Sequence, residues 1–278
     1  MALADSGALD LPPEFVRWNS ADQTFLRALP GYLDELAARW SLLIEPHFPG
    51  IRFNYVAPAT CADGTRAVLK VSRHVDETRN EIAALRLWDG DGACRLLEAD
   101  PEIGALLTER LDPGTMLVEV SEREDDAATL IAAQMLRRLW RPASEEDGLR
   151  PLASWCAGFD RNREALTRGA RGFPAAIFLR ADALRQALLD STPEQSVLHG
   201  DLHHFNVLRA QREPWLAIDP KGLLGDRCFD VCQFLRNPWP GPSDPVATNR
   251  RRLDIFCAEL GLDRARVKDW CFVHAVLD

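Results

Sequence analysis

The hydrophobic pattern of the chain changes once, near the turn sequence Asp112-Pro113-Gly114. Short apolar, β-prone runs prevail before this turn, whereas apolar residues recur three or four positions apart in most segments after it. The second pattern is typical of helices that are buried on one face. Strands in one part of a chain and helices in the other predict an α+β fold with two lobes and a cleft between them. The expected lobes are residues 1–111 and residues 112–278.

The first lobe is predicted to contain an antiparallel sheet of five strands and a helical N-terminal extension. The strand candidates are residues 42–45, 53–57, 66–71, 95–98 and 105–109. A helix over residues 76–88 is predicted to pack on this sheet, because it carries apolar residues on one face. The extension should hold a helix over residues 32–40 that begins at Pro30-Gly31, a pair that marks a break in regular structure.

The second lobe is predicted to be mainly helical. The helix candidates are residues 127–140, 152–168, 181–190, 249–260 and 264–277. Gly261 is expected to end one of these helices as a C-cap. Only residues 197–219 interrupt the helical pattern with short β-like runs.

The composition is that of an ordinary globular protein, with 46% hydrophobic and 27% charged residues. The seven cysteines form no C-x-x-C pair and no zinc-type spacing, so reduced and mostly buried thiols are expected. The first residues lack the apolar region of a signal peptide, and no run reaches the roughly 18 apolar residues of a membrane span. These features predict a cytoplasmic protein without a membrane partner.

The net charge of -9 argues against nucleic acid as a partner, because phosphate binding requires a basic face. Such acidity would suit a cationic ligand, although solubility alone explains it in many proteins. We expect a monomer or a weak dimer.

Residues 197–219 carry the polar side chains with the strongest functional signal. Asp201 follows a short apolar run, Asn206 comes five residues later, and Asp219 ends the next apolar run. Kinases use this arrangement for a catalytic base and two metal ligands. A single Asp or Asn in a loop is more often a turn residue or a helix cap, but the three residues in this order favour a function.

Phosphoryl transfer offers a role for each of these three residues. A carboxylate must orient the attacking hydroxyl and accept its proton, which fits Asp201. Asn206 and Asp219 provide hard oxygen ligands for a magnesium ion that keeps waters and phosphate oxygens. We therefore interpret Asp201 as the base and the other two residues as metal ligands.

One lysine, Lys70, lies inside an otherwise apolar strand. A buried ammonium group is costly unless an anion is close to it, and Glu81 on the following helix is the candidate. The pair would hold Lys70 against nucleotide phosphates. Glu77 on the same helix is an alternative partner, and an edge-strand lysine that points to water is the alternative reading of Lys70.

The strand candidate at residues 105–109 leads into the expected boundary between the lobes. Backbone groups of Glu109 and Leu111 are candidates for hydrogen bonds to an adenine edge, although an ordinary strand end explains the pattern equally well. No G-x-x-x-x-G-K-[ST] sequence occurs in the chain, which excludes a Walker-type nucleotide site. No complete G-x-G-x-x-G sequence occurs either.

Other polar residues near Asp201 are assigned supporting roles. His199 is expected to bond to the backbone rather than to transfer protons, and His203 and His204 are expected to pack or to order the loop. Asp230 is expected either to accept hydrogen bonds from the backbone of this loop or to cap a helix. An acidic cluster is interpreted as a solvated loop and helix start; it consists of Glu122, Glu124, Asp125 and Asp126.

Two segments resemble the catalytic and metal-binding motifs of the aminoglycoside phosphotransferase family. These are His-Gly-Asp-Leu-His-His-Phe-Asn-Val-Leu at residues 199–208 and Ile-Asp-Pro-Lys-Gly-Leu-Leu-Gly-Asp at residues 218–226. These segments are similar to the streptomycin 6-phosphotransferase and hydroxyurea kinase branch of the family. Residues 54–59, 63–65 and 68–70 also resemble the N-terminal lobe of that branch.

The resemblance implies a protein-kinase-like fold of two lobes, with ATP and Mg²⁺ bound between them. It also implies transfer of the γ-phosphoryl group to a hydroxyl of a small molecule. By position, Asp201 matches the base, Asn206 and Asp219 the metal ligands, Lys70 the phosphate-binding lysine and Glu81 its partner.

Three functions stay open at this point. A streptomycin-like, cationic acceptor leads, and it should meet carboxylates of the second lobe, for which the candidates are Asp226, Asp244, Glu145 and Asp160. A hydroxyurea-type or other small-metabolite kinase is the alternative within the same class. A non-catalytic kinase-like regulatory binding module is the alternative of another class, and such proteins typically lack one of the positions that this chain retains.

Overall fold

The computed structural model describes residues 9–168, 173–238 and 241–277. The chain forms two compact units, Met1–Ile82 with Cys94–Leu111 and Ala83–Ala93 with Asp112–Asp278. Residues 83–93, expected in the first lobe, thus belong to the second unit. The end of helix α3 (Val75–Trp88) is anchored there, because the indole Nε1 of Trp88 donates to the carbonyl oxygen of Leu139 at 2.8 Å.

A five-stranded antiparallel sheet forms the first unit, as the strand pattern predicts. Its strands are β1 (Leu42–Ile44), β2 (Asn54–Cys61), β3 (Arg66–Ser72), β4 (Leu96–Asp100) and β5 (Ala105–Glu109). The order across the sheet is β1-β2-β3-β5-β4. Strand β5 therefore lies between β3 and β4, which are consecutive strands of the chain connected through α3.

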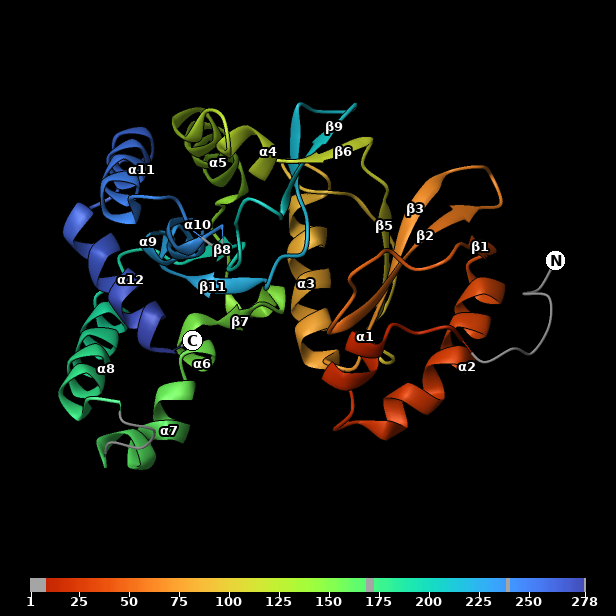
Figure 1. The fold of residues 1–278 in the computed structure, drawn as a ribbon, viewed down its shortest axis with the longest axis horizontal. Coiled ribbons are helices and arrows are strands. Elements are labelled where there is room, and N and C mark those ends of the chain that lie inside the picture. Colours follow the sequence, from red (N-terminus) through yellow and green to blue (C-terminus); the bar gives the residue numbers. More distant parts are fainter. Residues whose placement is uncertain (1–8, 169–172, 239–240, 278) are drawn as a thin grey trace. The chain divides into compact units, whose positions relative to one another are not determined.

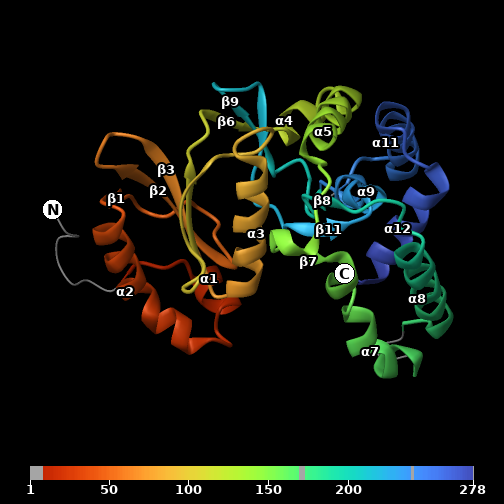
Figure 2. The ribbon, with the colours of Figure 1, turned by 180° about the vertical axis from the view of Figure 1, so that it is seen from behind.

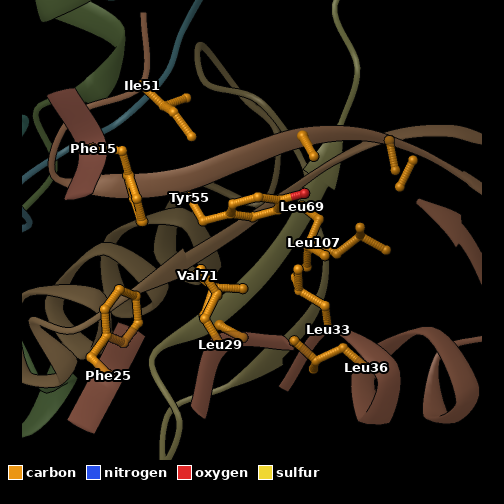
Figure 3. Close-up of a cluster of buried hydrophobic side chains, with 14 residues drawn as sticks. Phe15, Phe25, Leu29, Leu33, Leu36, Ile51, Tyr55, Leu69, Val71 and Leu107 are labelled. Atoms are coloured by element: carbon orange, nitrogen blue, oxygen red, sulfur yellow. The ribbon is translucent and has the colours of Figure 1, made fainter. Parts of the chain in front are cut away.

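Helix α2 (Gln23–Arg39) covers one face of this sheet (Figure 1). Its residues Leu29, Leu33 and Leu36 are buried in one cluster with Leu69 and Leu107 of the sheet (Figure 3). Side chains alternate between the two faces of a strand. Lys70, next to Leu69, therefore lies on the opposite face, where the first half of α3 runs.

Helix α2 begins at Gln23, well before Pro30, so the predicted start of this helix is wrong. The Asp22 side chain caps its N-terminus by accepting a hydrogen bond from the backbone N–H of Phe25 at 3.0 Å. Burial of Phe25 and Leu29 before the proline extends the apolar face, and this packing outweighs the local preference of proline. A short helix, α1 (Pro13–Trp18), precedes α2.

The second unit is mainly helical, as predicted. Its described helices are α4 (Val118–Ser121), α5 (Asp125–Leu139), α6 (Leu152–Trp155), α7 (Gly158–Thr167), α8 (Ala175–Asp190), α9 (Arg227–Asp230), α10 (Cys232–Arg236), α11 (Pro245–Leu260) and α12 (Arg264–Leu277), with a 3₁₀ turn at Glu145–Asp147. Helix α11 packs beside α5, and α12 beside α8, as both ribbon views show (Figures 1 and 2). Gly261 ends α11 in the left-handed conformation, which confirms it as the C-cap. The predicted helix at residues 152–168 is two helices, α6 and α7.

Two small sheets position the loop that carries Asp201. One contains β6 (Pro113–Met116), β9 (Val207–Ala210) and β10 (Trp215–Ala217), in the order β10-β9-β6. The other contains β7 (Arg150–Pro151), β8 (Ser196–Leu198) and β11 (Leu223–Gly225), in the order β7-β11-β8. The loop with Asp201 begins at the end of β8, in the β7-β11-β8 sheet, and ends at β9, in the β10-β9-β6 sheet. Both ends of the loop are therefore fixed by a sheet.

All seven cysteines are free thiols, and four of them are buried, in agreement with the sequence. None of the helices in the described part of the chain combines the length and the apolarity that a membrane crossing requires.

The apolar contact between α2 and the sheet should dominate the stability of the first unit. Leu36→Ala removes a fully buried side chain and should lower the free energy of unfolding by about 3 kcal/mol. Leu43 is 65% exposed, so Leu43→Ala makes the same chemical change and should cost less than about 1 kcal/mol. Urea unfolding measures both values, and equal losses would contradict the described packing.

Candidate active site

Asn206 and Asp219 lie at the same end of the β9–β10 hairpin. Val207 pairs with Ala217 in the ladder, and one step beyond this pair the backbone N–H of Ile218 donates to the carbonyl oxygen of Asn206 at 3.0 Å. The hairpin therefore brings together two oxygen-bearing side chains that are 13 positions apart in the sequence.

Asp201 and Asn206 bracket one closed loop. The side-chain Nδ2 of Asn206 donates to the backbone oxygen of Asp201 at 3.0 Å, and Asn206 is 7% exposed. This bond orients the amide and leaves its oxygen Oδ1 as the atom that can act as a ligand. The carboxylate of Asp201 lies on the same loop and is 17% exposed.

Asp219 has a backbone φ of 57°, in the left-handed region. Non-glycine residues rarely adopt this conformation, and it costs free energy that the surrounding structure must supply. Such strained positions cluster at functional sites. The strained backbone of Asp219 is therefore consistent with a functional role for its side chain.

His199 joins the two halves of this site through its ring. Its Nε2 hydrogen-bonds the carbonyl oxygen of Ile218 at 3.0 Å, and its Nδ1 accepts from the backbone N–H of Asp201 at 3.2 Å. These bonds require the tautomer with the proton on Nε2. Burial lowers the pKa of His199 to about 3, so the ring stays neutral. The expectation of a backbone-bonding role is confirmed.

The buried carboxylate of Asp230 braces the start of the loop. It accepts hydrogen bonds from the backbone N–H of His199 at 3.0 Å and of Gly200 at 2.6 Å. The indole Nε1 of Trp140 is a third donor, at 2.9 Å. The predicted bracing role of Asp230 is confirmed, whereas the contribution of Trp140 has no signal in the sequence because it comes from the end of α5.

The other two histidines of the loop differ in their surroundings. The ring of His204 is buried and stacks on Phe234 with 3.9 Å between centroids, and burial lowers its pKa to about 3. His203 accepts a hydrogen bond from the backbone N–H of Phe205 at 3.2 Å, and its Nε2 lies 3.9 Å from Oδ1 of Asp201. Burial also lowers the pKa of His203. His204 therefore packs and His203 orders the loop, as expected.

The first unit contains the predicted pair of Lys70 and Glu81. The ammonium Nζ lies 2.7 Å from Oε2 of Glu81, and the two side chains are only 12% and 7% exposed. This burial excludes the alternative of a lysine that points to water. Glu81, one helical turn after Glu77, makes this contact, which resolves the choice between the two acids.

The end of β5 holds Glu109 and, just beyond it, Leu111. The backbone N–H of Glu109 donates to the carbonyl oxygen of Arg95 at 2.9 Å. In return, the backbone N–H of Arg95 donates to the carboxylate of Glu109 at 2.8 Å. A backbone hydrogen bond between Glu109 and a ligand would therefore use the carbonyl oxygen as the acceptor. Leu111 is 9% exposed.

Asp226, proposed from the sequence as a contact of the acceptor, has a structural role. Its carboxylate accepts hydrogen bonds from Nε of Arg266 at 2.5 Å, Nε1 of Trp270 at 2.6 Å and the backbone N–H of Cys228 at 2.9 Å. Asp244 caps α11 through the N–H of Ala247.

A cavity of about 960 Å³ lies in the second unit and is lined by the acidic cluster at the start of α5, Glu122, Glu124, Asp125 and Asp126. None of the four acids proposed as acceptor contacts lines it.

Comparison with known proteins gives one family and several relatives. The pattern of the aminoglycoside/hydroxyurea antibiotic resistance kinase family matches residues 39–278. The chain is 40% identical to the streptomycin 6-kinase of Streptomyces glaucescens over 254 residues, which cover 90% of this chain and 81% of that protein. It is 37% identical to the hydroxyurea phosphotransferase of Kitasatospora aureofaciens, with coverage of 96% and 78%.

Among solved structures, the amicoumacin kinase in complex with AMP-PNP and Ca²⁺ is similar with a TM-score of 0.62. The two sequences are 16% identical, and the alignment covers 89% of this chain and 84% of that one. The chain thus has the protein-kinase-like fold that the sequence predicts.

Removal of one charge from the Lys70–Glu81 pair should destabilise the protein. Glu81→Gln takes away the carboxylate that faces a largely buried ammonium, and the expected loss is about 3 kcal/mol in the free energy of unfolding. The double variant Lys70→Met with Glu81→Leu removes both charges and should recover most of that loss. Urea unfolding measures both variants, and a loss below about 1 kcal/mol for Glu81→Gln would indicate a solvent-screened pair.

The titration of Asp230 should appear in the pH dependence of stability. Burial raises the pKa of this carboxyl to about 6 from an ordinary 3.8, so the folded chain binds a proton that the unfolded chain has lost. The contribution of Asp230 to the free energy of unfolding therefore rises as the pH falls from about 7 to about 5. Asp230→Asn does not titrate, so the native protein should gain about 1.4 kcal/mol relative to this variant over that interval.

Urea unfolding of both proteins at the two pH values tests this expectation. A difference between native protein and variant that stays constant or shrinks toward low pH would mean that the pKa of Asp230 is not raised.

Proposed function

The chain belongs to the aminoglycoside/hydroxyurea antibiotic resistance kinase family, and we propose that it is an ATP-dependent kinase that phosphorylates a hydroxyl of an aminoglycoside such as streptomycin. The observation that carries this proposal is the braced loop in which Asp201 and Asn206 are locked together and joined to Asp219 by the hairpin. The 40% identity to a streptomycin 6-kinase supports the acceptor class. Phosphorylation would inactivate the antibiotic, and it would take place in the cytoplasm.

Asp201 would be the catalytic base in this reaction. Its carboxylate would accept the proton of the acceptor hydroxyl as the hydroxyl oxygen bonds to the γ-phosphorus and the bond to ADP breaks. The ring of His199 holds the backbone N–H of Asp201, and Asp230 holds the two residues before it. The loop is therefore positioned before the acceptor binds, which reduces the reorganisation that the reaction requires.

Asn206 and Asp219 fit a magnesium ion by the chemistry of their donors. Both offer oxygen atoms, the ligands that Mg²⁺ prefers. Within the described ranges, no three His, Cys, Asp or Glu side chains gather as a metal-binding cluster. Phosphate oxygens and water would therefore complete the coordination, as is usual for Mg²⁺ in kinases. The bound ion would neutralise charge on the phosphates.

Lys70, Glu81, Glu109 and Leu111 are proposed to bind the nucleotide. The Lys70 ammonium, kept in place by Glu81 at 2.7 Å, would attract phosphate oxygens. The carbonyl oxygen of Glu109 and the backbone N–H of Leu111 would hydrogen-bond the adenine edge, since the N–H of Glu109 is already used.

A second acceptor is favoured by a specific observation, the 37% identity to a hydroxyurea phosphotransferase over 96% of the chain. Hydroxyurea is small and neutral, whereas streptomycin is large and carries guanidinium groups. The same catalytic residues would serve both acceptors, so the choice between them depends on residues outside the phosphoryl-transfer machinery.

Asp201→Asn tests the proposed reaction. The amide keeps the shape of the side chain but accepts a proton poorly, so phosphorylation should fall by at least about a hundredfold. ATP binding, followed by the thermal shift that the nucleotide causes, should persist. Formation of ADP and phosphorylated product with streptomycin, with hydroxyurea and with common metabolites provides the measurement. Equal background turnover by the native protein and the variant with every acceptor would favour a non-catalytic binding module.

A further inference from the structure

The imidazole of His199 packs against an aromatic ring from another element of the second unit. Trp88, the last residue of α3, lies nearly parallel to it, with 6.2 Å between the ring centroids and 19° between the ring planes. Both side chains are buried, with exposed fractions of 1% for Trp88 and 0% for His199. An offset, stacked arrangement of this kind is favourable for two aromatic rings. The ring that joins Asp201 to Ile218 therefore has a fixed apolar neighbour.

The hydrogen bonds of His199 by themselves leave the tilt of its ring loosely defined. Its Nδ1 accepts from the backbone N–H of Asp201 at 3.2 Å, and its Nε2 donates to the carbonyl oxygen of Ile218 at 3.0 Å. Hydrogen bonds weaken steeply only at angles below about 120°, so both bonds tolerate an appreciable tilt. A ring packed alongside does not, because a tilt brings atoms of a close-packed interior into overlap. The plane of the imidazole, and with it the position of the Asp201 N–H, therefore depends on Trp88.

The indole of Trp88 is itself held by the end of α5 and the residues after it. Its Nε1 donates to the carbonyl oxygen of Leu139 at 2.8 Å. Nη1 of Arg141 donates to the carbonyl oxygen of Leu87 at 2.8 Å, and the carbonyl oxygen of Arg141 accepts from the backbone N–H of Val197 at 3.0 Å. The end of α3 is therefore tied to β8, the strand that leads into the loop with the proposed base.

We propose that Trp88 is a positioning residue for phosphoryl transfer that acts through His199. The indole sets the plane of the imidazole. The imidazole in turn holds the N–H of Asp201 and the carbonyl oxygen of Ile218, which directly precedes Asp219. One buried ring contact therefore orients the base and one metal ligand relative to each other. This inference rests on the proposed function and gives Trp88 a role beyond the packing of α3.

Two substitutions of Trp88 separate the ring contact from the hydrogen bond. Trp88→Leu and Trp88→Phe both lose the bond to Leu139, but only Trp88→Phe keeps an aromatic ring beside His199. With streptomycin as the acceptor, kcat should fall about tenfold in Trp88→Leu and stay within about threefold of the native value in Trp88→Phe, because a small displacement of a catalytic group slows the reaction strongly. The KM values for ATP and streptomycin should change less than about twofold, since the lost interaction acts on the transition state.

Amide hydrogen exchange provides a measurement that does not depend on turnover. The backbone N–H of Asp201 donates to the ring of His199, so it should exchange about tenfold faster when the ring is free to tilt in Trp88→Leu. In Trp88→Phe this rate should stay within about threefold of the native rate. NMR spectroscopy resolves the exchange of this single N–H.

Phe159→Leu is the matched control for a general loss of stability. Phe159 of α7 is 2% exposed, and its ring stacks on Phe178 of α8 with 5.5 Å between centroids. This variant thus also replaces a buried, stacked ring with leucine. Its free energy of unfolding should fall, whereas its kcat and the exchange of the Asp201 N–H should remain at their native values. Activities are compared well below the melting temperature of each variant.

The results separate the role of Trp88 from the reaction itself. Selectively faster exchange of the Asp201 N–H in Trp88→Leu, in a protein that phosphorylates no acceptor, would retain the contact that positions Asp201 and refute the proposed reaction. A native kcat or a native exchange rate in Trp88→Leu would overturn the positioning role. An equal loss of kcat in Trp88→Phe would assign the effect to the hydrogen bond with Leu139, and an equal loss in Phe159→Leu would assign it to general destabilisation, so either result would also overturn that role.

Discussion

One buried carboxylate supports the candidate active site. Asp230 accepts hydrogen bonds from two successive backbone N–H groups and from the indole of Trp140. Burial of an ionisable group is costly, and burial raises the pKa of this one to about 6. The hydrogen bonds offset part of that cost and fix the start of the loop. The ring of His199 then bonds to the carbonyl oxygen of Ile218. By holding His199, Asp230 therefore also orients the hairpin that carries Asp219.

Two further buried charges, those of Lys70 and Arg252, are neutralised by ion pairs with neighbouring carboxylates. Each ion pair lies in a different part of the proposed enzyme. The Lys70–Glu81 pair lies on the face of the sheet opposite to α2 and holds the Lys70 ammonium in one position. The Arg252–Asp125 pair joins two helices and shapes a cavity wall. In this wall, ion pairs with α11 neutralise Asp125 and Asp126, whereas no described residue forms an ion pair with Glu122 or Glu124. Formal net charge of the chain does not distinguish these two groups.

Residues close together in the sequence were predicted well, and residues brought together by packing were not. The Asp201–Asn206 loop and the strand with Lys70 follow from local patterns, whereas the bracing role of Asp230 joins residues 30 and 31 positions apart. The choice of Glu81 over Glu77 required the helix itself, because both residues share one helical face. The carboxylate of Asp226 is occupied by Arg266 and Trp270, which are 40 and 44 positions away, and no local pattern predicts these contacts. The acidic cluster is largely exposed at a loop and helix start, as expected. The ion pairs of Asp125 and Asp126 come from α11, more than 100 positions further along the chain.

The sequence by itself determined the fold class, the family and the chemical groups for phosphoryl transfer. Alternation, helical periodicity and motif spacing are properties of residues close together in the sequence, so they can be recognised without the tertiary structure. The tertiary structure decided that Asp125 and Asp126 are neutralised by Arg252 and Arg251. It also placed Asp219 in a left-handed conformation and brought Trp140 onto Asp230. These features depend on contacts between distant segments, whose free energies are set by burial and geometry that no local pattern records.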